Sequence, residues 1–277
     1  MSSIAPPAQR FLLGIAEDLT RGDVNFPTCL DAAMKIRLAL NNPDLTVDAL
    51  SRIVATEPLV SAKVIRLANS AALNTSGKEI ADVRTAVTRV GFASIRTLAI
   101  SVAIEQLMLE KEMGPYLDSA RDLWEHSLEV AALSYVISRR MTRINPHEAM
   151  FAGLVHDIGH FYLLYQVALH PAIARDEEEL GRILDEWHAS IGHAVLGALD
   201  APEAILEAVA DHERDFDGPV PVTLAQVMFL ANGLAEHPNP FSEPSSDNDG
   251  RTPAHGIVGI LDESREELDS IIAALGC

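Results

Sequence analysis

A histidine and an aspartate stand next to each other inside an apolar stretch of this sequence. His156 and Asp157 lie in the run LVHDIGH (154–160), directly after the apolar residues AMFAG. Adjacent side chains on a helix point about 100° apart, so both could reach one divalent ion. A buried carboxylate needs either a cation or a hydrogen-bonded polar group beside it. The pair is therefore a candidate metal site, with a buried hydrogen-bonded pair as the alternative.

Three further histidines, His126, His193 and His212, fall on predicted helices among apolar neighbours. Metal sites in helical bundles are built from several helices that each contribute one inward histidine or carboxylate. Nitrogen and oxygen ligands of this kind suit iron, manganese, zinc or nickel. The other histidines are expected at helix ends or in loops, in contact with solvent: His147, His170, His188, His237 and His255.

The elements that would position these residues are predicted to be helices. Apolar residues recur with helical spacing along the chain, and the alternation typical of strands is nearly absent. Gly91 is expected to end one helix in the left-handed conformation, and Gly114-Pro115 to divide the chain into two parts. The helices predicted around the candidate site and after it cover residues 92–113, 121–141, 147–165, 176–186, 188–199, 202–213, 222–236 and 263–275.

We therefore predict an all-α, compact multi-helix bundle in which an N-terminal helical subdomain packs on a second helical subdomain. The expected division, in chain order, is a helical extension, the first subdomain, the second subdomain, a Pro-rich loop without periodicity and a C-terminal helix: 1–24, 25–113, 115–236, 237–256 and 257–277.

The charge of the chain excludes some partners. Lys and Arg number 21 against 40 Asp and Glu, a net charge of −19. Such a surface repels nucleic-acid backbones and anionic lipids, so neither nucleic acid nor a membrane is expected as a partner. No apolar run reaches the roughly 18 residues of a membrane span, and no signal peptide is visible. Cys29 and Cys277 have no metal-type spacing, which fits a cytoplasmic protein.

Taken together, these motifs resemble the His-Asp metal phosphohydrolase superfamily, and within it the HDOD domains. In the second half the resemblance rests on WEH (124–126), GLVHDIG (153–159) and DHE (211–213). In the first half it rests on Glu57-Pro58, on LANSA (67–71) and on the pattern that ends at Val90-Gly91, and overall it runs from about Asn25 to Glu236. It implies a bacterial-type signalling module that acts by binding a partner protein in trans or a nucleotide-like ligand.

The resemblance also implies which residues would hold a metal. It transfers His126, His156 and Asp157 as ligands of one ion, and His193 and His212 as ligands of a second ion. Two positions depart from the superfamily pattern. Asn232 replaces the late Asp that closes the metal site, and His160 replaces a Lys that contacts phosphate. The resemblance therefore implies a degenerate centre that can still bind a divalent metal.

The alternative function is a metal-dependent phosphohydrolase or phosphodiesterase that acts on a nucleotide or a cyclic dinucleotide. A divalent ion would then activate water for attack on phosphorus, assisted by His160 or Glu213. Because Asn232 brings no negative charge to the site, we expect little or no turnover. The regulatory module is therefore the leading hypothesis.

Overall fold

The computed structural model describes residues 6–21, 31–174, 176–214, 218, 220–242 and 257–276, and within them every regular element is a helix. This confirms the all-α prediction. The elements, in chain order, are α1 Pro6–Arg21, α2 Asp31–Leu40, α3 Val47–Ala55, α4 Pro58–Ala68, α5 Val83–Met108, the 3-10 turn η2 Lys111–Tyr116, α6 Leu117–Met141, α7 Pro146–Val155, α8 Ile158–Leu169, α9 Glu177–Ala198, α10 Glu203–Ala210, α11 Leu224–Leu234, α12 Ile257–Glu263 and α13 Arg265–Leu275.

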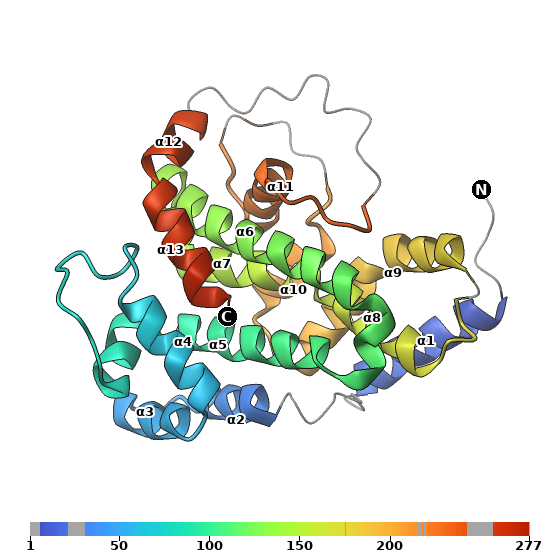
Figure 1. Cartoon of the computed structure of the whole chain (residues 1–277), viewed down its shortest axis with the longest axis horizontal. Coiled ribbons are helices and arrows are strands. Elements are labelled where there is room, and N and C mark those ends of the chain that lie inside the picture. The colour runs from blue at the N-terminus through green and yellow to red at the C-terminus, as the bar shows by residue number, and fades with distance from the viewer. Residues whose placement is uncertain are drawn as a thin grey trace.

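Two long helices organise the bundle. Helices α2, α3 and α4 pack on α5, while α7, α11 and α13 pack on α6. Figure 1 shows α5 and α6 each running across the molecule, with α2 to α4 at one end and α8, α9 and α1 at the other. The C-terminal helix α13 lies along α6 and also contacts α4, so the last residues of the chain touch helices from both halves.

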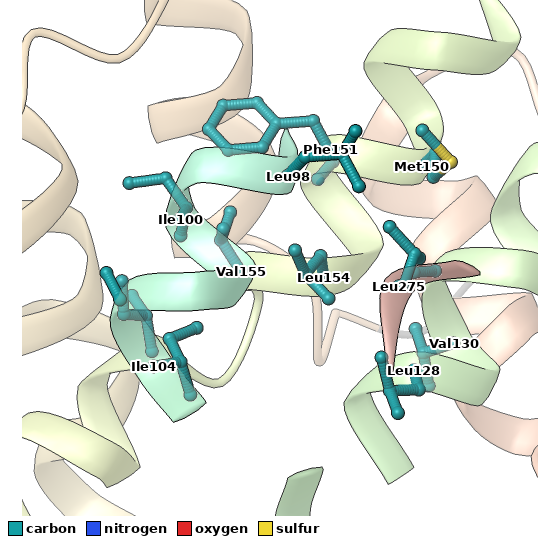
Figure 2. Packing of buried hydrophobic residues seen from close by; sticks show 14 of the residues in the cluster. Leu98, Ile100, Ile104, Leu128, Val130, Met150, Phe151, Leu154, Val155 and Leu275 are labelled. Carbon is teal, nitrogen blue, oxygen red and sulfur yellow. The ribbon is translucent and has the colours of Figure 1, made fainter. Parts of the chain in front are cut away.

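The core lies where α7 is enclosed by α5 and α6. Figure 2 shows Leu98 and Ile104 of α5 on one side of Leu154 and Val155 of α7, with Val130 of α6 on the other. All five side chains are at most 3% exposed. Burying an aliphatic side chain of this size contributes about 1.5–3 kcal/mol relative to leaving it in water. The apolar run before His156 is therefore the central core helix, and its packing fixes where the helix ends.

The start of α7 is set by its local sequence. Asn145 caps the helix, because its side chain accepts a hydrogen bond from the backbone N–H of His147. Pro146 occupies the first turn, where no intrahelical partner for a backbone N–H is needed. The two residues fix the register of α7, and with it the position of His156 at the end of the helix.

The helix predicted over 147–165 is wrong in one respect. It is two helices, α7 and α8, and His156 and Asp157 form the junction between them. The ring of His156 hydrogen-bonds the Gly153 carbonyl, which Asp157 N–H would take in a continuous helix. Asp157 leaves the helical conformation with φ −101° and ψ 16°. The chain therefore bends at the residues that the sequence marks as chemically interesting.

Two other predicted helix bounds differ, and a third, at Gly91, does not. The segments 176–186 and 188–199 form one continuous helix, α9. Gly91 has the expected positive φ, 80°, and its non-helical backbone separates two helical segments that meet at a kink within α5. The C-terminal segment forms two helices, α12 and α13. A glycine tolerates positive φ at no steric cost, so helical residues can continue on both sides of Gly91.

By length and composition α5 could cross a membrane, with a mean hydropathy of 1.4 over its most apolar window. However, 67% of that window is buried inside the protein. Among the described residues, this burial is that of a core helix of the bundle.

Candidate metal centre

Five histidines and one aspartate from separate elements meet in the interior, and we call them the histidine cluster. His126 comes from α6, His160 from α8 and His188 from α9, while His212 follows the end of α10. His156 and Asp157 form the α7–α8 junction. Each residue of the cluster is at most 2% exposed. Polar side chains buried to this degree need partners, and the partners define what the cluster can do.

In four of the histidines, Nδ1 is hydrogen-bonded to a backbone carbonyl oxygen. A carbonyl oxygen can only accept, so Nδ1 carries the proton and, in the neutral ring, Nε2 carries a lone pair. A hydrogen bond from the ring nitrogen that does not bind the metal is the usual way in which metal-binding histidines are oriented. The Nδ1–oxygen distances are 2.8 Å from His126 to His237, 2.8 Å from His156 to Gly153, 3.0 Å from His188 to Leu184 and 2.6 Å from His212 to Val209.

Three of the four Nε2 atoms point toward Asp157. Nε2 of His156 lies 3.0 Å from Asp157 Oδ2, and Nε2 of His126 lies 3.7 Å from the same oxygen. Nε2 of His212 lies 3.8 Å from Asp157 Oδ1. Two overlapping groups result, one of His126, His156 and Asp157, the other of Asp157, His188 and His212, and in each group the ligand atoms lie within 4.8 Å of one another.

The Nε2 atoms of His126, His156 and His188 are buried and have no hydrogen-bond partner among the described residues. Leaving such an atom unsatisfied costs about 1–3 kcal/mol. At His156 a lone pair would also face a carboxylate oxygen at 3.0 Å. A divalent cation bound by His126, His156 and Asp157 would satisfy the first two of these atoms, so this donor set fits a metal ion.

The charge state of the first group also favours a cation. Burial lowers the pKa of His126, and the neighbouring His156 lowers it further, so that the ring is neutral at physiological pH. Burial raises the pKa of Asp157, but the adjacent His156 and His160 outweigh burial and hold it well below its usual range. The first group therefore offers a neutral imidazole and an ionised carboxylate, the forms that bind metals.

His188 differs from the other rings because Glu213 stands beside it. Nε2 of His188 lies 3.3 Å from Oε1 of Glu213, whose side chain is 56% exposed. Burial lowers the pKa of His188, but Glu213 and Asp157 outweigh burial and raise it to about 9. In the absence of a metal, the ring carries a proton at neutral pH. A metal at the second group must therefore displace this proton.

His160 lies against the cluster between two rings. It stacks on His188 with a centroid distance of 4.1 Å and on Phe241 at 5.5 Å. Its Nδ1 lies 3.2 Å from Asp157 Oδ1, and the ring is 1% exposed. His160 is thus placed to orient the Asp157 carboxylate. The catalytic roles suggested for His160 and Glu213 stay predictions.

The segment after α11, residues 235–242, closes one side of the cluster, and we call it the strap. The His237 carbonyl accepts from His126 Nδ1. Asn239 Nδ2 donates to Asp157 Oδ2 at 2.8 Å, while its Oδ1 accepts from Phe241 N. The strap is held from outside by Glu129, which accepts from both His237 N and His237 Nδ1. It therefore contributes a polar side chain to the centre that sequence reasoning did not identify.

The structure leaves one predicted ligand outside the cluster. His193 is exposed on α9, and the α9 histidine inside the cluster is His188, which the sequence had placed at a solvated helix end. The two residues are five positions apart, which is about 140° around a helix. If 176–199 is treated as one helix, His188 falls on the apolar face with Leu184 and Ile191. That continuity was the missing signal.

A similar difference concerns two asparagines: the sequence singles out Asn232, whereas Asn239 is the one in contact with the cluster. Asn232 is half-buried on α11, and the amide that hydrogen-bonds Asp157 comes from Asn239, seven residues later. Residues 243–256 of the predicted loop, with His255, lie outside the described residues. Asn239 was missed because it sits in a Pro-rich segment without periodicity, where sequence gives no indication of burial.

Two glycines bring α8 and α9 close enough to form the cluster. A Cβ atom added to Gly159 would lie 1.9 Å from the His188 carbonyl oxygen and 2.8 Å from Gly192 N. Only a residue without a side chain fits there, because such distances are far inside van der Waals contact. Gly159, two residues after Asp157, therefore allows His188 to reach the aspartate.

Solved structures show the same fold. A protein of Shewanella amazonensis SB2B, provisionally named a metal-dependent phosphohydrolase, matches with a TM-score of 0.69 and 24% identity over 97% of this chain and 99% of its own. An HDOD domain protein of unknown function from Geobacter sulfurreducens matches with 0.63 and 22% over 96% and 98%. A protein of Marinobacter aquaeolei VT8, provisionally named a signal transduction protein, matches with 0.60 and 21% over 99% and 67%.

Sequence comparison gives the family directly. An uncharacterised protein of Treponema pallidum (strain Nichols) is 21% identical over 200 residues, which are 69% of this chain and 38% of that protein. The chain thus spans less than half the length of this relative. The HDOD domain family matches residues 26–215, more than half of the chain, and these residues include every member of the histidine cluster. The chain belongs to the HDOD family.

Proposed function

We propose that this chain is an HDOD regulatory module whose core holds one divalent metal ion, bound by His126, His156 and Asp157. The observation that carries the proposal is the set of buried Nε2 atoms that lack hydrogen-bond partners and are oriented by Nδ1 contacts to backbone carbonyls. A bound ion would supply positive charge where three elements bring lone pairs together. Two imidazoles and one carboxylate suit iron, manganese, zinc or nickel.

The charge of the cluster favours one ion over two. Asp157 is its single carboxylate, and it belongs to both possible ligand groups. Two divalent ions would bring four positive charges to a buried site against one negative charge, which is costly in a low-dielectric interior. The second group also contains His188, whose raised pKa of about 9 means that a proton already resides there. The first group is therefore the site proposed for the ion.

Burial supports a regulatory role over hydrolysis. A divalent ion in such a site can activate water toward phosphorus, but a phosphate substrate must first reach it. The candidate ligands are at most 2% exposed, and the strap hydrogen-bonds both His126 and Asp157. We therefore propose that the module acts by binding a signalling partner in trans, with the ion stabilising or reporting its conformation. A nucleotide-like ligand and phosphohydrolase activity remain the rival proposal.

Elemental analysis of the purified full chain tests the metal. We expect about one equivalent of a transition metal in the unsubstituted protein and its loss in His156→Ala and Asp157→Ala. The matched control is His193→Ala, which removes an exposed histidine from the same half of the chain. Stoichiometric metal in all four proteins, or metal in none of them even after refolding with added Mn²⁺, Fe²⁺ or Zn²⁺, would overturn the proposed centre.

Hydrolysis is tested separately with bis(p-nitrophenyl) phosphate and with cyclic dinucleotides, in the presence of added Mn²⁺ or Fe²⁺. We expect no turnover above that of Asp157→Ala. Turnover that depends on Asp157 and rises when Asn239 is replaced by Ala would favour the phosphohydrolase, because it would show that the strap opens to admit a substrate.

A further inference from the structure

A groove of about 620 Å³ lies on the surface where α5, α6 and α13 meet. One wall is a stripe of α6 with helical spacing, from Leu117 through Trp124 and Leu128 to Glu129. The two ends of the stripe are 12 positions apart, so it is about 18 Å long at 1.5 Å per residue. None of its side chains belongs to the histidine cluster, although Glu129 also holds the strap. This length matches about three turns of a second helix laid along it.

The groove is apolar at its base and has an exposed apolar lip. Trp124 and Leu128 form part of the base, with Met108 of α5 and Ile272 of α13 beside them. Leu109 stands at the lip and is 77% exposed, the most exposed of the large apolar side chains described. An apolar side chain beside an apolar groove is the arrangement that a docked amphipathic helix covers.

Carboxylates outnumber cations around this groove. Glu105, Glu125 and Glu129 line it, while Arg121 is its one lysine or arginine and lies 3.7 Å from Asp118. Glu105 is already paired with Lys63 at 3.0 Å, so Glu125 and Glu129 are the carboxylates that a partner would meet. Glu125 is 58% exposed. The chain as a whole carries a net charge of −19. This charge disfavours a second copy of the chain, a nucleic acid or an anionic membrane as the occupant, and it favours a basic one.

We propose that this groove is the docking site for a basic amphipathic helix of a partner protein. The inference deepens the proposed function, on which it rests, by giving the regulatory module a surface and its partner a chemistry. Apolar residues at i, i+3, i+4 and i+7 of the partner would cover Trp124 and Leu109, and lysines or arginines at its flanks would meet Glu125 and Glu129.

The groove and the metal centre are connected through His237 of the strap, which lines the groove. Glu129 accepts from His237, and Glu125 lies 3.6 Å from the same ring. The His237 carbonyl in turn holds Nδ1 of His126. A lysine or arginine of the docked helix would therefore compete for the carboxylates that anchor the strap. His237 is thus the single residue that connects the docking surface to His126, a candidate metal ligand.

The test is a calorimetric titration of the full chain with a synthetic 14-residue helix of leucines and lysines in amphipathic order. The same helix with glutamate in place of lysine serves as the peptide control. We expect 1:1 binding of the basic helix, weakened by salt, and no binding of the acidic one. Leu109→Ser and Glu125→Lys should each weaken binding by about tenfold or more, as loss of a central contact does.

Matched substitutions elsewhere separate docking from general attraction to an acidic protein. Leu38→Ser replaces another leucine that is 62% exposed, and Glu203→Lys makes the same charge change on α10. Both should leave the dissociation constant within about twofold, the range of peripheral contacts. No binding, a stoichiometry other than 1:1, equal losses in test and control variants, or a dimer that buries Leu109 would overturn the proposal.

Metal analysis of the same preparations keeps the two proposals apart. Peptide binding without bound metal would overturn the proposed metal centre and leave the groove. Bound metal without peptide binding would overturn the groove and leave the metal centre.

Discussion

Asp157 is the residue on which the centre depends. Its Oδ2 faces His126, His156 and the amide of Asn239, while its Oδ1 faces His160 and His212. A single buried carboxylate that faces four histidine rings and an amide concentrates negative charge at one point. That charge attracts a cation, and its limited amount restricts how many cations can bind.

Asn239→Asp tests this limit on charge. The amide N–H that now donates to Asp157 at 2.8 Å would be replaced by a carboxylate oxygen. The metal-free protein should melt at a lower temperature, because two buried carboxylates repel. Metal affinity should rise by about 10–100-fold, the usual size of effects next to metal ligands. Melting curves with chelator and with metal, together with a competition titration, measure both changes.

Asn232→Asp is the matched control, since it introduces the same charge on α11 at the position where the superfamily pattern has its late acid. We expect it to change metal affinity far less than Asn239→Asp does. The reverse order would show that the α11 position, rather than the strap, completes the centre.

Acid should destabilise the metal-free protein through His212. Burial and the neighbouring His156 lower the pKa of His212 to about 4, below its ordinary value of 6.5. As the pH falls below 6.5 the unfolded chain takes up this proton before the folded protein does. The stability contribution is therefore complete above pH 6.5 and is lost toward pH 4, on the order of 3 kcal/mol in total.

Urea unfolding at pH 7 and at pH 4.5, in the presence of a chelator, measures this loss. His212→Asn should unfold with a smaller difference between the two pH values. An undiminished difference in that variant would assign the acid sensitivity to other groups.

At the scale of elements, the crossing of α8 and α9 decides whether the cluster forms. The two helices touch at Gly159 and Gly192, where the backbones are too close for a side chain on Gly159. Close helix contacts of this kind hold the flanking residues in a fixed register. The histidine of α9 is thereby placed opposite the aspartate at the start of α8.

Gly159→Ala should separate the two helices. The added methyl would stand 1.9 Å from the His188 carbonyl oxygen, so the backbone must move. We expect a loss of about 1–3 kcal/mol in the free energy of unfolding, the usual cost of overpacking. Bound metal should decrease as well. Denaturant titration and elemental analysis measure the two effects.

Gly181→Ala is the control on the same pair of helices. Nothing lies within 4 Å of a Cβ placed on Gly181, and helical glycine is about 0.5–1 kcal/mol less favourable than alanine. This variant should be as stable as the unsubstituted protein or slightly more so. Equal destabilisation of both variants would contradict the role of the close contact.

For the whole molecule, α13 connects the two halves through Lys63 of α4. The ammonium group of Lys63 is buried and contacts Glu105 at 3.0 Å as well as the carbonyls of Leu275 and Gly276. Arg66, one turn along α4, donates to the carbonyls of Ala273 and Gly276. Cations at a helix C-terminus satisfy the last carbonyls and interact favourably with the helix dipole.

Lys63→Met should weaken this connection. It keeps most of the apolar stem but leaves Glu105, whose side chain is 12% exposed, without its cation. Removing one partner of a buried ion pair costs about 3–5 kcal/mol, with the lower end expected for a carboxylate that water still reaches. Limited proteolysis should cut α13 sooner than in the unsubstituted protein. Lys78→Met, at an exposed position, should change neither the free energy of unfolding nor the rate at which α13 is cut.

The sequence alone determined the helical class and the central motif. Helical spacing of apolar residues depends on local order in the chain, so it indicates helices such as α4, α6 and α11 without knowledge of their neighbours. The apolar context of His156 and Asp157 likewise shows that the pair is buried. These properties follow from residues that are close together in the chain.

Only the tertiary structure decided which further residues join that pair. His188 and His193 are equally plausible until the rotation of α9 is known, and its packing through Gly159 sets that rotation. Asn239 enters the centre because the strap folds back over α6, a contact between residues 82 positions apart. A metal site built from distant segments depends on how helices pack, and local sequence does not contain that information.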